Sequence, residues 1–254
     1  MTANLLDTHC HLDLYADPMA LLDQARKASV DIVAVTQDPG KFRLLRTRLG
    51  RRQGVRLGIG LHPLRVTERY HLELDRLRRL VSQADWVGEV GLDFSKEGIA
   101  TKKQQTGAFD ALLALEEVRH RPMTVHSRRA EKDTISRLLQ ADVTAILHWY
   151  TGSMRDAEQA ISGGLWFSIN HAMIRSSRTA SLLRTIPPQH ILLETDGPFV
   201  RYGDRPVKPE DLPAIVKQLA SVWRISREEA TAQIEINQRR VIALMRPGPS
   251  GPPT

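Results

Sequence analysis

Two histidines, two residues apart, end the first apolar run of the chain, Leu5-Leu6-Asp7-Thr8-His9-Cys10-His11-Leu12. The run has the length of a β-strand, and side chains at positions i and i+2 of a strand point to the same side. We therefore predict that His9 and His11 can reach one metal ion together. Taken alone, the run is equally compatible with two half-buried histidines at a strand edge.

The rest of the chain predicts seven further strands, each followed by a helical segment. Apolar runs of strand length lie at residues 31–36, 55–60, 86–89, 122–126, 143–148, 165–169 and 191–194. Helical patterns cover residues 18–29, 39–50, 68–84, 102–120, 130–140, 153–162, 178–184, 209–222 and 226–244, and residues 197–208 are predicted to be irregular. Eight alternations of strand and helix are typical of a TIM barrel, the (β/α)8 fold. A doubly wound sheet would need a glycine-rich phosphate turn after the first strand, where this chain has its two histidines.

The bulk composition agrees with one globular domain, which we predict over residues 1–245. The 254 residues are 41% hydrophobic and 26% charged, as is ordinary for a protein with a substantial core. No linker or shift in composition divides the chain before residue 246. The stretch 246–254 is rich in proline and glycine and is predicted to be disordered.

The predicted compartment is the cytoplasm, without a membrane partner. We find no charged segment followed by the apolar stretch of a secretion signal, and no apolar run of membrane length. The single cysteine, Cys10, cannot form a disulfide within the chain, which fits a reducing compartment.

The charge balance is basic, with 36 lysines and arginines and a net charge of +7. A basic surface attracts polyanions such as nucleic acid. Arg175, Arg178, Arg201 and Arg205 are predicted on loops or helix starts at one end of the barrel, where they could track a phosphate backbone. The alternative is that each of these arginines is only solvated.

Polar residues recur where predicted strands end. They are His9 and His11, then His62, Glu89, His126, His148 and Asp196. The carboxyl ends of all barrel strands meet at one mouth, so these side chains are predicted to converge. Neutral imidazole and carboxylate groups are ligands for Zn, Mn or Mg. His62 is not needed as a ligand, and the other six are still too many for one tetrahedral ion, so two ions about 3.5–4 Å apart that share a carboxylate are the simplest arrangement.

The sequence motifs around these residues resemble those of a known family. The motifs are Asp7-Thr8-His9-Cys10-His11-Leu12, Gly60-Leu61-His62-Pro63, Gly88-Glu89-Val90-Gly91-Leu92-Asp93, His126-Ser127-Arg128, His148-Trp149-Tyr150-Thr151-Gly152-Ser153 and Glu194-Thr195-Asp196-Gly197-Pro198. In order and spacing, from about residue 5 to residue 243, they resemble the TatD family of metal-dependent deoxyribonucleases. The sequence segments around these motifs are most similar to those of the TatD-like nuclease of Qat anti-phage defence cassettes.

This resemblance implies a barrel of the amidohydrolase-like, metal-dependent hydrolase type that cleaves DNA phosphodiesters with two divalent cations. It implies that His9, His11 and Asp196 hold one ion, that His126 and His148 hold the other, and that Glu89 bridges them. Partners implied are DNA and the other proteins of a Qat-type cassette. The chain departs from the family at Val207-Lys208-Pro209-Glu210, where members often carry an Asn-Glu-Pro segment, and this affects the substrate end of the pocket.

The expected mechanism is attack on phosphorus by a water acidified between the two cations. Asp196 is the predicted proton acceptor, and Arg128 is predicted to offset charge on the phosphate oxygens. His62 is predicted to contact a phosphate or the leaving oxygen, with a strand-end histidine braced by Pro63 as the alternative.

Several neighbours of these residues are predicted to support the site. Glu194 and Asp93 are expected to orient ligands, and Cys10 is expected to point away from the metals. Trp149 and Tyr150 could stack on an unpaired base, although packing is the expected fate of at least one of them.

Two other functions are compatible with the sequence. One is hydrolysis of a different ester, such as a D-aminoacyl-tRNA linkage, an activity attributed to some relatives. The other is a mainly non-catalytic role as a binding subunit of a defence complex, which the complete set of candidate ligands argues against.

Overall fold

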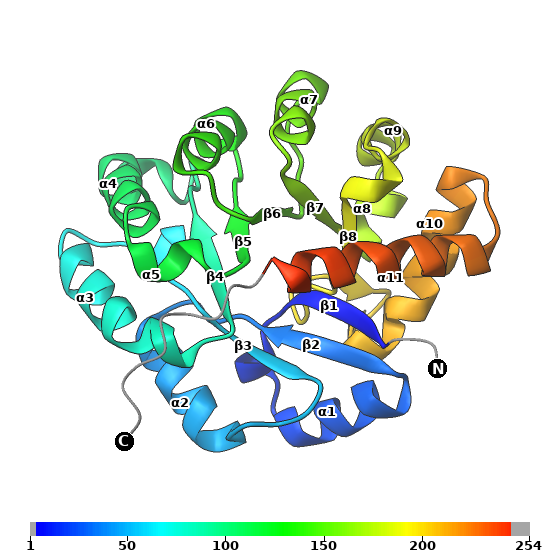
Figure 1. Cartoon of the computed structure of the whole chain (residues 1–254), viewed down its shortest axis with the longest axis horizontal. Helices are drawn as coiled ribbons and strands as arrows, with labels where there is room; N and C mark the ends of the chain where they lie inside the picture. Colours follow the sequence, from blue (N-terminus) through cyan, green and yellow to red (C-terminus); the bar gives the residue numbers. More distant parts are fainter. Residues whose placement is uncertain (1–3, 245–254) are drawn as a thin grey trace.

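The protein is a closed barrel of eight parallel strands, as predicted (Figure 1). We describe residues 4–244 from a computed structural model, and the predicted tail at 246–254 lies outside the described residues. The strands are β1 (Leu5–Cys10), β2 (Val30–Ala34), β3 (Val55–Ile59), β4 (Trp86–Gly91), β5 (Met123–His126), β6 (Ala145–His148), β7 (Trp166–Ile169) and β8 (Ile191–Leu193). Each strand pairs with its neighbours in the sequence, and β1 closes the barrel against β8 where Asp7 lies opposite Leu193.

Helices surround the barrel. They are α1 (Pro18–Lys27), α2 (Pro39–Leu49), α3 (Tyr70–Leu80), α4 (Lys102–Leu113), α5 (Glu116–Arg119), α6 (Glu131–Ala141), α7 (Met154–Ser162), α8 (His171–Arg175), α9 (Ser177–Thr185), α10 (Leu212–Trp223) and α11 (Arg227–Ala243). The predicted helix starts are confirmed at two caps. The Asp17 side chain accepts hydrogen bonds from the amides of Met19 and Ala20, and Ser226 and Glu229 form a capping box. Within residues 4–244, no helix combines the length and the apolar character that crossing a bilayer requires.

Three predicted elements differ in the structure. The single helix predicted at 102–120 is two helices, because Leu115 adopts an extended conformation between α4 and α5 and is partly buried against the core. The stretch 197–208, predicted to be irregular, contains the antiparallel hairpin of β9 (Arg201–Tyr202) and β10 (Arg205–Pro206). The first strand ends at Cys10 rather than Leu12, because His11 begins the short 3-10 turn Leu12–Leu14.

The barrel interior is an apolar cluster that lies apart from the larger core between strands and helices. Its members come from six strands or their ends and from one helix: Leu6, Val33, Val35, Trp86, Ile146, Trp166, Leu192 and Val241. Helix α11 carries Val241 and is docked on the amino-terminal ends of the strands. There Gln238 accepts from the amide of Leu6, and Asn237 donates to the carbonyl of Ile191. The amino-terminal end of the barrel is therefore sealed by α11.

Polar side chains lie above this apolar layer because inward-facing positions alternate along a strand. Each inward apolar residue is followed two positions later by a polar one in the pairs Ile146 and His148, Trp166 and Ser168, and Leu192 and Glu194. On β1 and β4 the corresponding spacing is three, from Leu6 to His9 and from Trp86 to Glu89. Register shifts between Asp7 and Cys10 and between Val87 and Val90 accommodate the extra residue. These irregularities turn His9 and Glu89 toward the mouth of the barrel.

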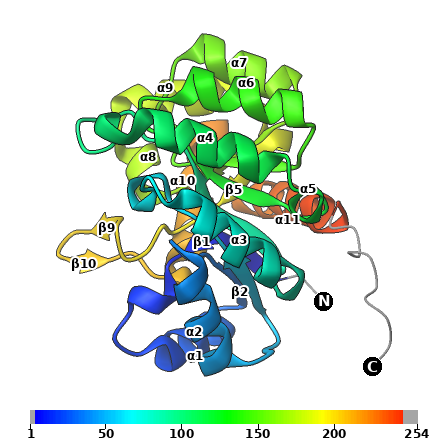
Figure 2. The same ribbon diagram turned by 90° about the vertical axis from the view of Figure 1, so that its left-hand side faces the viewer.

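The hairpin of β9 and β10 projects from the body of the molecule, on the side away from α11 (Figure 2). It follows β8 directly and therefore lies beside the carboxyl ends of the strands. Helix α10 then returns the chain to the outer layer. The hairpin of β9 and β10 is therefore part of the rim of the barrel mouth.

Candidate metal centre

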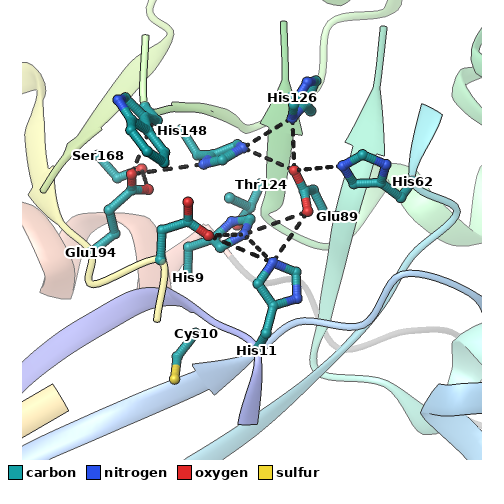
Figure 3. Close-up of polar contacts among 12 residues, drawn as sticks. His9, Cys10, His11, His62, Glu89, Thr124, His126, His148, Ser168 and Glu194 are labelled. Carbon is teal, nitrogen blue, oxygen red and sulfur yellow. Dashed lines mark hydrogen bonds and ion pairs between the residues drawn. The ribbon is translucent and has the colours of Figure 1, made fainter. Parts of the chain in front are cut away.

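Seven of the side chains predicted for the site converge at the mouth of the barrel (Figure 3). They come from β1 and the ends or loops of β3, β4, β5, β6 and β8: His9, His11, His62, Glu89, His126, His148 and Asp196. All of them are buried except His126, which is partly exposed. Among the described residues, three groups have the spacing of metal ligands: His9, His11 and Asp196; His9, Glu89 and His148; and His62, Glu89 and His126.

The first cluster of donor atoms has the dimensions of a tetrahedral coordination shell. His9 Nε2 and His11 Nε2 are 3.1 Å apart, and each lies 3.6 Å from Asp196 Oδ1. Glu89 Oε2 lies 3.7 Å from His9 Nε2 and 3.3 Å from His11 Nε2. Ligand atoms about 2.1 Å from a central zinc lie roughly 3.4 Å from one another. These five distances are close to those between ligands around one ion, and His9, His11 and Asp196 form one of the groups with ligand spacing.

The second cluster uses the other oxygen of the same carboxylate. Glu89 Oε1 lies 2.9 Å from His126 Nδ1 and 2.9 Å from His148 Nε2, and these two nitrogens are 3.4 Å apart. One oxygen of Glu89 thus faces the first cluster and the other faces the second. A single carboxylate shared in this way is the arrangement of a bridging ligand.

A carboxylate lies beside the outer nitrogen of each histidine in the second cluster, within hydrogen-bond distance for His126 and farther away for His148. Asp93 Oδ2 lies 2.8 Å from His126 Nε2, and Glu194 Oε1 lies 3.7 Å from His148 Nδ1. A proton held on the nitrogen that faces each carboxylate leaves the other nitrogen free as a ligand. Asp93 and Glu194 therefore occupy the orienting positions predicted for them.

Glu194 is fully buried, and several neighbours donate hydrogen bonds to its carboxylate. Its carboxylate accepts hydrogen bonds from Asn170 Nδ2 at 2.8 Å, from the amide of Trp149 at 3.1 Å and from the Ser168 hydroxyl. Sequence analysis did not identify Ser168 and Asn170. Their position after the inward-facing Trp166 is the signal that could have revealed them.

His62 differs from the other histidines in where it carries its proton. Its Nδ1 accepts a hydrogen bond from the amide of Leu64 at 3.1 Å, so in the neutral ring the proton resides on Nε2. That Nε2 lies 3.3 Å from Glu89 Oε1. Burial lowers the pKa of His62, which favours this neutral form. His62 therefore presents a hydrogen-bond donor to the site and not a lone pair.

The electrostatics of the cluster fit a bound cation. Burial lowers the pKa of His9 well below its usual value, so its ring is neutral and offers a lone pair. Burial alone would raise the pKa of Glu89, but the histidines around it, with His148, His11 and His126 among them, together hold that pKa well below the usual range. Burial raises the pKa of Asp196 well above its usual value, and Glu194 and Glu89 add to this shift. Lone pairs and carboxylate charge gathered in a buried site are stabilised by a divalent metal, which the donor set therefore fits.

A second buried carboxylate, Asp7, connects the two strands that close the barrel. Its oxygens accept hydrogen bonds from the amide of Thr195 at 2.9 Å, from the Thr195 hydroxyl at 2.5 Å and from the amide of His9 at 3.2 Å. Burial raises the pKa of Asp7 to about 7. These bonds hold His9 on β1 in place beside Asp196, which follows Thr195. Sequence analysis did not assign Asp7 a role, although an aspartate inside an apolar strand was a usable signal.

The cluster forms the floor of a cavity of about 580 Å³. Arg128 lines this cavity, as predicted, and lies 3.6 Å from Glu97. Arg175 and Arg178, which were predicted at the same mouth, do not line this cavity. Each of them lines a different surface depression.

Other predicted neighbours of the site have mixed outcomes. Arg205 is engaged by Asp211 through two bonds of 2.7 Å, and Arg201 donates to the carbonyl of Asp204. Tyr150 is fully buried and bonded to Ser153, which confirms the expectation that at least one of Trp149 and Tyr150 packs and does not stack on a base. Cys10 is buried and points away from the histidines, as expected (Figure 3).

A TIM barrel whose mouth carries a shared carboxylate among histidines defines the class of metal-dependent hydrolases. Residues 6–243 match the TatD related DNase family, and the chain belongs to this family. It is 30% identical over 261 residues to the human deoxyribonuclease TATDN3, covering 94% of both chains. It is 32% identical over 200 residues to the 3'-5' ssDNA/RNA exonuclease TatD of Erwinia tasmaniensis, covering 73% of this chain and 77% of the relative.

A solved structure supports the fold independently. The TatD homologue YjjV of Escherichia coli superposes with a TM-score of 0.84 and 24% identity, covering 95% of this chain and 98% of that one.

Proposed function

We propose that the protein is a divalent-metal-dependent deoxyribonuclease that uses two ions. The observation that carries the proposal is the position of Glu89, whose two oxygens face two separate clusters of nitrogen donors. His9, His11 and Asp196 would hold the first ion, and His126 and His148 the second. Family membership and the relatives named as nucleases support DNA as the substrate.

The metals, when bound, would acidify a water and stabilise charge on a phosphodiester. The residues of the chain would supply the remaining functions. Asp196 would accept the proton of that water, because its carboxylate lies within 3.6 Å of both His9 and His11 at the first cluster. Arg128 would offset charge on the outer phosphate oxygens. His62 would donate the proton on Nε2 to a phosphate oxygen or to the leaving oxygen.

The substitution Glu89→Gln tests this proposal. We expect it to remove cleavage of DNA in Mg²⁺ or Mn²⁺, with a loss beyond the roughly 10–100-fold typical when a residue behind a ligand is changed. Release of acid-soluble nucleotides measures activity, and elemental analysis of the purified protein measures bound metal. Glu73→Gln, which alters an exposed ion pair on α3, is the matched control. Cleavage at the normal rate by the Glu89 variant would refute the bridging role.

We also propose that this nuclease acts in the cytoplasm as part of an anti-phage defence cassette of the Qat type. The similarity of the phrases around the motifs supports this role, and the single buried, free cysteine is compatible with the compartment. Cells that carry the cassette should lose protection against phage when Glu89→Gln is introduced. Full protection by that variant would favour the alternative of a non-catalytic subunit.

Ester hydrolysis on D-aminoacyl-tRNA is the competing activity. Net charge and donor set are compatible with either substrate. Parallel assays of DNA and of charged tRNA with the same metal-loaded protein separate the two.

A further inference from the structure

An apolar rim surrounds the polar floor of the cavity. Leu64, Trp149 and Phe199 all line the cavity that contains Glu89. They follow β3, β6 and β8, which are spaced nearly evenly around the closed eight-stranded barrel. Leu64 is 43% exposed and Phe199 is 51% exposed, so burial in the core does not account for either side chain.

Phe199 has a defined position relative to the metal cluster. Its amide donates to the carbonyl of Asp196 at 2.8 Å, and the amide of Val200 donates to the same carbonyl at 3.2 Å. The Phe199 ring stands nearly perpendicular to the His11 ring, with an interplanar angle of 84° and centroids 5.1 Å apart. The aromatic ring is therefore fixed at the edge of the floor while half of its surface remains open.

The chain that carries Phe199 is anchored on its far side as well. The amide of Val207 donates to the carbonyl of Val200 at 2.9 Å, and the Tyr15 hydroxyl donates to the carbonyl of Val207 at 2.7 Å. In the hairpin between them, the Tyr202 ring lies against the His171 ring with centroids 4.6 Å apart. An exposed ring on a braced segment loses little conformational entropy when a ligand stacks on it.

The chemistry of the floor and the rim together favours a nucleotide. A phosphodiester over Glu89 would place its sugar and base beside the rim, and the volume of about 580 Å³ is in the usual range for a small-ligand pocket. The net charge of +7 and Arg128 at the rim complement a polyanion. A base exposes its face for stacking on an aromatic ring only when it has left the duplex stack.

We propose that Phe199 is the stacking platform for an unpaired nucleobase of the strand whose phosphate occupies the metal cluster. The inference rests on the proposed phosphodiesterase function and adds to it a residue that recognises the base. Phe199 contributes aromatic surface to binding and leaves the metal ligands unchanged.

The test compares two oligomers of equal length, oligo-dT and the same sugar-phosphate chain without bases. Binding is measured by fluorescence anisotropy in Ca²⁺, and cleavage is measured as kcat/KM in Mn²⁺. The unmodified protein should prefer oligo-dT by about tenfold or more in both assays, since stacking on one base contributes on that order.

The variants identify the residue responsible. Phe199→Ala and Phe199→Leu should reduce the preference for oligo-dT to about one, because neither has an aromatic face. Phe199→Trp should restore the preference. Leu44→Ala, which removes a side chain that is 67% exposed on α2, should leave it unchanged. Metal content should be the same in all of these proteins.

Each outcome has a distinct meaning. Equal cleavage of both oligomers by the unmodified protein would overturn the stacking role while the nuclease function stands. A preference that persists in Phe199→Ala would also overturn it. Preferential binding of oligo-dT that depends on Phe199, without any cleavage, would support the stacking role and contradict the proposed hydrolysis.

Discussion

The histidines of this site have different functions because the ring nitrogen that faces away from Glu89 contacts a different neighbour in each of them. Asp93 faces Nε2 of His126 and leaves Nδ1 directed at Glu89. For His62 the neighbour is a backbone amide, which is a donor, so the ring must place its own proton on the nitrogen that faces Glu89. The backbone turn after β3 thus makes His62 a proton donor, whereas the other histidines remain metal ligands.

This assignment predicts the behaviour of His62→Ala. We expect the variant to keep the metal content of the unmodified protein and to lose about 10²-fold in kcat, the lower range for a general acid. The loss should be smaller on a diester with p-nitrophenolate as leaving group, because that group departs without a proton. Elemental analysis and kinetics on both substrates provide the measurements. A fall in bound metal would instead make His62 a ligand.

At this scale the sequence predicts positions better than roles. The residues at strand ends are readable because a barrel gathers them at one mouth, and His9, Glu89 and Asp196 were placed there correctly. The choice between Nδ1 and Nε2 depends on contacts such as the Leu64 amide, which only the folded chain defines. The part played by Phe199 was missed because an aromatic residue after a Gly-Pro pair has no distinctive spacing.

The seam between β1 and β8 is the element on which the first cluster depends. It has a single matched pair in the ladder, Asp7 with Leu193, and β8 is only three residues long. The Asp7 carboxylate adds three hydrogen bonds across or beside this seam. Side-chain bonds therefore supplement a short ladder where the barrel closes.

Asp7→Ala is expected to destabilise the fold. The change leaves the buried amides of His9 and Thr195 without this acceptor, which corresponds to about 2–6 kcal/mol for two unsatisfied donors. Urea unfolding of the metal-free protein measures the effect. Asp23→Ala on α1, where the side chain is exposed, should change stability by less than about 0.5 kcal/mol. A similar stability for both variants would show that the seam does not need the carboxylate.

Strand irregularities limit prediction at the scale of elements. Strict alternation from Leu6 and Trp86 would turn Thr8 and Gly88 inward, whereas register shifts turn His9 and Glu89 inward. Such bulges depend on pairing with neighbouring strands, which periodicity in one strand does not contain. The hairpin of β9 and β10 was missed for a related reason, since its strands have two residues each.

At the scale of the whole molecule, the barrel interior is apolar at the amino-terminal ends of the strands and polar at the mouth, where the carboxyl ends lie. Residues such as Trp86 and Ile146 fill the interior, and α11 closes its end with Gln238 and Asn237. The mouth concentrates buried carboxylates and imidazoles instead. The fold therefore tolerates an electrostatically unfavourable site because the remainder of the barrel is conventionally packed.

Metal binding should consequently stabilise the whole molecule. Mn²⁺ at 100 times its dissociation constant adds about 2.7 kcal/mol, which for a chain of this size raises the melting temperature by several degrees. Differential scanning fluorimetry with Mn²⁺ and then with chelator measures the shift and its reversal. Glu89→Gln should show a much smaller shift, and an equal shift in that variant would place the metal elsewhere.

The first metal cluster joins two ends of the polypeptide that are synthesised at very different times. His11 and Asp196 are separated by 185 residues, so a ribosome needs roughly 10–40 s to add the second after the first. Until β8 emerges and pairs with β1, the growing chain has histidines but no Asp196 to complete the group. The first cluster can therefore be completed only after nearly all of the barrel has been translated, and the proposed nuclease activity would begin at that stage.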